Sequence, residues 1–101
     1  MTFEKDKFYV IRADRAGVFI GKIIEENSGT IRANNLRRLY YWSGALDVTQ
    51  LAKEGVGNPS RCKFSVQLGD DDISTIYNVI EVHSCTEKAL HTIQSVPAWK
   101  S

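Results

Sequence analysis

The sequence has few cysteines and no long apolar run. Its 101 residues include two cysteines, two prolines and one methionine. Cys62 and Cys85 are too few for a disulfide scaffold, so we expect free thiols. No run approaches the roughly 18 apolar residues of a transmembrane helix, and the first eight residues mix both charge signs, unlike a secretory signal. These absences predict a protein that acts in the cytoplasm and does not enter a membrane.

A large net charge is also missing. Thirteen Lys and Arg oppose twelve Asp and Glu, which leaves +1 at pH 7. No overall field therefore draws the chain to nucleic acid or membrane. The balance is uneven along the chain, because residues 1–43 carry eight bases and five acids whereas residues 69–101 carry two bases and five acids. This asymmetry favours a basic pocket for a small anion or contact between copies of the chain, although an evenly solvated surface explains it equally well.

The residues that are present predict an ordinary globular fold. With 43% hydrophobic and 25% charged residues, the chain has the composition of a folded domain, and its length predicts a single domain over residues 1–101. Alternating apolar residues and turn signals predict a mainly antiparallel sheet of about five to six strands with two short helices, an α+β fold. The expected strands cover residues 8–13, 17–24, 30–33, 36–42, 61–68 and 73–83, and the expected helices cover residues 48–54 and about 85–95.

Two of the expected strands make specific predictions about burial. Residues 8–13 are apolar on both alternating sets, which predicts a strand covered on both sides. Residues 61–68 alternate without a break, which predicts a half-buried strand. Its expected inward set is Cys62, Phe64, Val66 and Leu68.

Capping residues predict where the helices begin. Asp47 with Gln50, and Ser84 with Glu87, have the spacing of capping boxes. Gly55 is placed to end the first helix. After the second helix, we expect Trp99 to fold back onto the core.

The segment richest in binding chemistry is residues 37–42. Arginine offers a planar fork of donors that suits phosphate, and aromatic rings stack on bases. The alternative is that the rings belong to the core and the arginines cover its rim. The candidate ligand-binding residues are Arg37, Arg38, Tyr40, Tyr41 and Trp42.

The sequence offers little support for catalysis, a metal site or a cofactor. Cys85 is the one candidate nucleophile, with His83 near it in sequence, but a buried first-turn cysteine is the better explanation. Three consecutive acids, residues 70–72, lack the spacing of a calcium loop and are typical of a solvated turn. We therefore expect no enzyme activity, no metal and no cofactor.

Four segments resemble an uncharacterised family of small phage and prophage proteins. The family pattern runs approximately ARRLWYWSGA, LxQLAxEG, PCTEKA and VPxWK. The chain departs from it at three positions, since Leu36, Tyr40 and Ser84 stand where the family has Ala, Trp and Pro. The resemblance implies a phage-encoded accessory protein and implies no activity. The matching segments are residues 36–45, 50–55, 85–89 and 96–100.

The leading hypothesis joins this origin to the arginine–aromatic segment. It is a non-enzymatic, homo-oligomeric phage protein in the host cytoplasm that sequesters a nucleotide signalling molecule of host antiviral immunity. The arginines would pair with phosphate while a ring stacks on the base. One alternative is a protein-interaction module that inhibits a host enzyme through the same aromatic cluster. The other is a single-stranded nucleic-acid binder.

Overall fold

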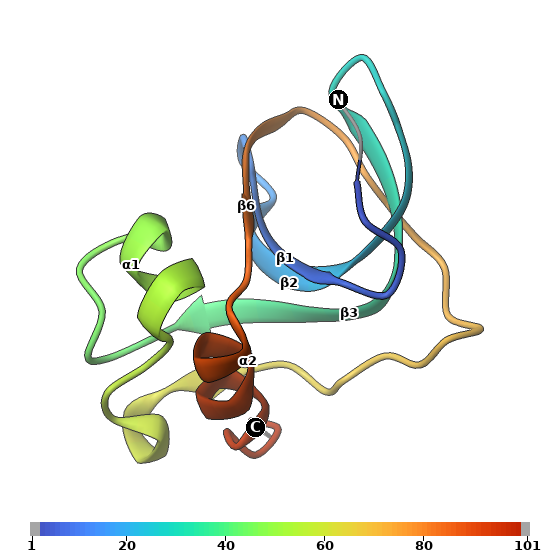
Figure 1. Cartoon of the computed structure of the whole chain (residues 1–101). Helices are drawn as coiled ribbons and strands as arrows, with labels where there is room; N and C mark the ends of the chain where they lie inside the picture. Colours follow the sequence, from blue (N-terminus) through green and yellow to red (C-terminus); the bar gives the residue numbers. More distant parts are fainter. Residues whose placement is uncertain (1–2, 100–101) are drawn as a thin grey trace.

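The computed structural model describes residues 3–99, which form six strands, two α-helices and one short 3₁₀ helix (Figure 1). This content confirms the expected α+β fold. In chain order the elements are β1 (Phe8–Ala13), β2 (Gly17–Asn27), β3 (Thr30–Tyr41), α1 (Val48–Glu54), η1 (Pro59–Arg61), β4 (Lys63–Phe64), β5 (Ser74–Ile76), β6 (Val79–Ser84) and α2 (Glu87–Gln94).

The strands form one strongly curled antiparallel sheet. Its order is β4-β3-β2-β1-β6, and β5 pairs with β3. Only Tyr77 and Asn78 separate β5 from β6, although β5 pairs with β3 and β6 pairs with β1. The chain can make this step only because the sheet curls round and brings its edges together, as Figure 1 shows. The amide of Val79 donates to the carbonyl of Gly29 (2.9 Å) and helps to hold the curl.

The curl has a local cause in β2. Its pairing with β3 shifts register between Ile20 and Lys22 and again between Ile23 and Glu25. Such bulges bend a strand and increase its twist. Gly21 lies at the first bulge, where an added Cβ would stand 2.8 Å from Leu36 Cδ1. The bend therefore needs a residue without a side chain at this position.

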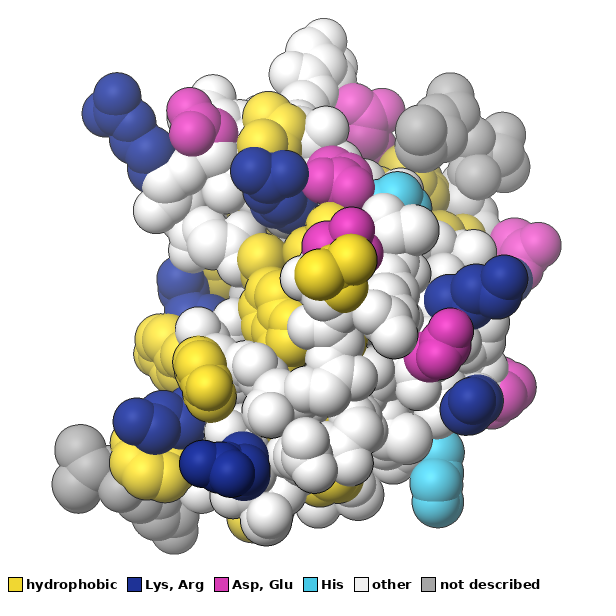
Figure 2. Space-filling view, turned by 90° about the vertical axis from the view of Figure 1, so that its left-hand side faces the viewer, with side chains coloured by type: hydrophobic (Ala, Val, Ile, Leu, Met, Phe, Trp, Pro, Cys, Tyr) yellow, Lys and Arg dark blue, Asp and Glu magenta, His cyan; other side chains and the backbone are white. Residues whose placement is uncertain are grey.

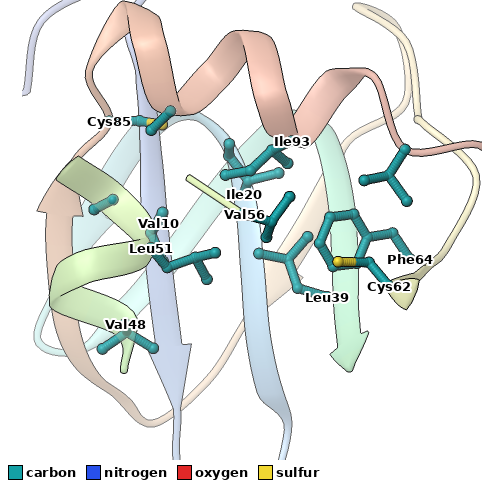
Figure 3. Packing of buried hydrophobic residues seen from close by; sticks show 13 residues of the cluster. Val10, Ile20, Leu39, Val48, Leu51, Val56, Cys62, Phe64, Cys85 and Ile93 are labelled. Atoms are coloured by element: carbon teal, nitrogen blue, oxygen red, sulfur yellow. The ribbon is translucent and has the colours of Figure 1, made fainter. Parts of the chain in front are cut away.

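Each face of the curled sheet packs against its own hydrophobic core. Successive side chains of a strand point to opposite faces, so Val10 faces the helices while Tyr9 and Ile11 face the inside of the curl. All three are buried, which confirms that β1 is covered on both sides. On the helix side, Leu51 of α1 and Ile93 of α2 pack over the sheet (Figure 3).

The first helix begins and ends where the sequence predicts. Asp47 caps α1 by accepting from the amide of Gln50 (3.0 Å), and Gly55 follows its last turn. The second helix begins later than predicted, at Glu87. Its cap is Thr86, whose Oγ1 accepts from the amide of Ala89 (3.1 Å), so the predicted capping box from Ser84 is wrong.

The expected strand over residues 61–68 is mostly wrong. Only Lys63–Phe64 is a strand, because η1 covers its start and residues 65–68 follow the edge of β3 through separate hydrogen bonds. Cys62 and Phe64 are buried as predicted, but Val66 is 54% exposed because no layer covers that part of the edge. The two expected strands at residues 30–33 and 36–42 form one strand, β3. Trp99 is also 54% exposed and does not fold back onto the core.

Candidate ligand-binding cleft

Neighbouring arginines of β3 point to opposite faces of the sheet, and Arg37 is the buried one. It is 4% exposed. Its Nε donates to the carbonyl of Ser65 (2.7 Å) and its Nη1 to the carbonyl of Ile93 (3.0 Å), while Nη2 donates to the carbonyl of Val96. Burial lowers the pKa of Arg37, but an arginine stays protonated at neutral pH. Its donors hold β3 to the C-terminal end of α2, so we leave Arg37 out of the candidate site.

Arg38 lies on the inner face of the curl and is only partly buried. Its guanidinium carbon lies 4.5 Å from the ring centroid of Phe19 and 5.9 Å from that of Tyr40. One nitrogen, Nη1, donates to the carbonyl of Ala16 (2.5 Å). The two rings and this hydrogen bond set the direction of the guanidinium before any ligand arrives.

Arg38 lines a cleft of about 530 Å³ at one end of the curled sheet. One wall is the turn between β1 and β2, which includes Arg15. The opposite wall is residues 74–78, which include Tyr77 at 65% exposure. The amide of Asp14 donates to the carbonyl of Asn78 (2.9 Å) and joins the two walls. Three segments far apart in the sequence thus form one concave surface.

The cations of the cleft are less neutralised than three other cations of the sheet. Arg12, Lys22 and Arg32 each form an ion pair with an acid. Within residues 3–99, neither Arg15 nor Arg38 has such a partner. One acid, Asp14, also lines the cleft. Two cations and one acid leave the cleft positive, which suits an anionic ligand.

The other two candidate residues lie away from the cleft. Trp42 is partly buried and packs against the helix-side core. Tyr41 is 55% exposed and lies opposite Lys63 of β4. Of the five residues named from the sequence, only Arg38 therefore lines the cleft, and the ring of Tyr40 lies beside its guanidinium.

Three residues of this site were missed from the sequence: Arg15, Phe19 and Tyr77. The sequence signal for Arg15 is weak: it is a basic residue in an expected turn. In the structure it adopts a positive φ of 67°. Phe19 has the pattern of a core residue, and it is buried. Tyr77 reaches the cleft through the step between β5 and β6, which no local pattern predicts.

Outside the cleft, the pKa values of Cys85 and Glu81 are also shifted. Burial raises the pKa of Cys85 to about 11, which keeps this thiol protonated at neutral pH. The Glu81 carboxylate forms side-chain hydrogen bonds with His83 (2.6 Å) and Arg12 (3.1 Å). In the part of the chain that the structure describes, no cluster of His, Cys, Asp or Glu could hold a metal ion. The same residues include no helix long and apolar enough to cross a bilayer.

Fold and site together define a small α+β protein with a cation-lined, aromatic-walled cleft. The chain belongs to the family of a domain of unknown function, DUF6948, whose model matches residues 6–93. The whole cleft lies within the matched region, whereas Trp99 lies beyond it. No curated protein matches the chain, and no solved structure matches it.

Proposed function

We propose that this protein is a non-enzymatic binding protein whose cleft captures a small phosphorylated ligand that carries an aromatic base. The observation that carries the proposal is Arg38, a partly buried guanidinium oriented by Phe19 and Tyr40. A cation held in place by rings and a carbonyl loses little side-chain entropy when it binds. Such an arginine binds phosphate more tightly than a freely moving surface arginine does.

The other residues of the cleft suit the same ligand class. Arg15 supplies a second cation across the opening from Tyr77, whose exposed ring can stack on a base. Small-molecule sites commonly have volumes of about 300–1,000 Å³, and the cleft of about 530 Å³ lies within this range. A nucleotide combines the phosphate, the ring and the size that these features require.

We also propose where this protein acts. The segments at residues 36–45 and 85–89 resemble those of phage and prophage proteins, which supports an accessory protein made in an infected host. In the host cytoplasm, the cleft would sequester a nucleotide signal of antiviral immunity. Assembly of several copies would follow from the opposite charge of the two ends of the chain.

The test is a panel of linear and cyclic nucleotides, with melting temperature and calorimetry as readouts. A ligand at about 100 times its Kd adds about 2.7 kcal/mol to the free energy of unfolding. For a chain of this size, this raises Tm by more than roughly 10 °C. We expect at least one nucleotide to do so, and Arg38→Gln to abolish the shift.

Arg32→Gln is the matched control. Arg32 is an exposed arginine of the same strand, and its Nη1 lies 3.2 Å from Glu25 Oε1, away from the cleft. This variant should keep the ligand-induced shift. If no nucleotide of the panel moves Tm, the proposed function is wrong, and a stoichiometric host protein captured from lysate would then favour the protein-interaction alternative.

A further inference from the structure

A second cationic and aromatic surface lies beside the cleft, where β3 meets β4. Tyr41 of β3 is paired with Lys63 of β4. Lys63 Nζ lies 4.7 Å from the ring centroid of Trp99, and the amide of Trp99 donates to the carbonyl of Phe64 (2.8 Å). Tyr41 and Trp99 are 55% and 54% exposed. We call Tyr41, Lys63 and Trp99 the outer platform.

A bulge connects the outer platform to the cleft. The pairing of β3 with β4 shifts register between Leu39 and Tyr41, and bulges re-aim side chains. Tyr40 and Tyr41 are consecutive, yet their exposures are 65% and 55%, whereas alternation would bury one of them. Tyr40 contacts Arg38 of the cleft, and Tyr41 adjoins Lys63. Tyr40 and Tyr41, adjacent in the sequence, thus place one ring beside Arg38 and the next opposite Lys63, which lies over Trp99.

The charge of the outer platform also matches that of the cleft. Within residues 3–99, neither Lys63 nor the nearby Arg61 forms an ion pair. Figure 2 shows one face of the molecule on which Lys and Arg side chains lie among hydrophobic ones. Rings interleaved with cations form the surface on which bases stack and phosphates are neutralised.

We infer that the outer platform is a second nucleotide subsite, so the ligand of this protein is a dinucleotide or a short oligonucleotide. This inference rests on the proposed function. The first nucleotide occupies the cleft, with its phosphate on Arg38. The second base stacks on Trp99, and Lys63 neutralises the phosphate that joins the two nucleotides. An acidic peptide would pair with the cations but would leave the rings without a stacking partner.

The experiment compares the affinities of one mononucleotide, the matching dinucleotide and a six-nucleotide single strand for the full chain. We expect the dinucleotide to bind about tenfold more tightly than the mononucleotide, because stacking of one base has that order of effect. Fluorescence provides a second readout, since Trp99 is exposed while Trp42 is partly buried. The dinucleotide should quench the emission of Trp99 and the mononucleotide should not.

Variants separate the two subsites. Trp99→Ala and Lys63→Gln should remove the tenfold gain and leave mononucleotide affinity unchanged, whereas Trp99→Phe should keep most of the gain because a ring remains. Lys88→Gln on α2 is the matched control and should change nothing. The four variants replace three side chains, all at exposed positions, so folding should persist, and circular dichroism checks it.

The outcomes separate failure of the second subsite from failure of the proposed function. Equal affinity for mononucleotide and dinucleotide, unaffected by Trp99→Ala, overturns the second subsite and leaves the proposed function standing. Polyglutamate that competes as well as the six-nucleotide strand also overturns it, because the surface would then recognise charge alone. Failure of every nucleotide to bind overturns the proposed function itself.

Discussion

Replacement of Arg37 tests whether the structure has assigned the two neighbouring arginines correctly. Arg37→Ala removes a guanidinium that is 4% exposed and that donates to three backbone carbonyls. Two of these acceptors, Ile93 and Val96, lie at the C-terminal end of α2, where free carbonyls concentrate negative partial charge. The substitution leaves all three carbonyls without this donor and opens a cavity between β3 and α2.

The expected loss is large for a protein of this size. One hydrogen bond to a charged group contributes about 1.5–3 kcal/mol, and each buried acceptor left without a partner costs about 1–3 kcal/mol. The free energy of unfolding of a domain is about 5–15 kcal/mol. A loss of 3 kcal/mol lowers Tm by roughly 12–24 °C. Arg37→Lys should recover part of this loss, because one ammonium cannot reach all three carbonyls.

The assay is thermal and urea unfolding followed by circular dichroism, with Arg38→Ala as the comparison. Arg38 is half-buried and makes one side-chain hydrogen bond, to Ala16, beside its two ring contacts. Its loss should cost about 1.5–2 kcal/mol, less than the loss of three buried hydrogen bonds. If Arg37→Ala has the same Tm as the wild type but no longer binds the ligand, this reasoning is wrong and Arg37 belongs to the site.

Two further predictions concern a turn and a carboxylate. Gly55→Ala should destabilise the protein by more than about 1 kcal/mol, because Gly55 has a φ of +78° and an added Cβ would stand 1.8 Å from Thr92 Oγ1; an unchanged urea midpoint would contradict this. Hydrogen bonds from His83 and then from Arg12 lower the pKa of Glu81, so its stabilising effect is complete above its unfolded pKa of about 4.3. The effect is lost as pH falls through the lower folded pKa. Glu81→Gln should therefore have a lower Tm than the wild type at pH 7. The two Tm values should converge in acid.

The sequence by itself determined part of the local structure of this protein. Apolar residues on both alternating sets of residues 8–13 require a strand with two covered faces. Asp47 and Gly55 mark both ends of α1, because a cap and a left-handed stop depend only on nearby residues. The α+β class followed from the same short-range patterns. Residue type selected Arg37, Arg38, Tyr40, Tyr41 and Trp42 as candidates, and it could not separate Arg38, which lines the cleft, from the other four.

Only the tertiary structure decided which of these residues can meet a ligand. Arg37 and Arg38 are adjacent and chemically identical, yet one is buried under α2 and the other lines a cleft, because alternate side chains of β3 face different layers. The exposure of Val66 and Trp99 depends on which layers cover the edge of β3. Arg15, Arg38 and Tyr77 meet because the sheet curls until distant segments touch. Long-range closure of this kind has no signature in the spacing of residues along the chain.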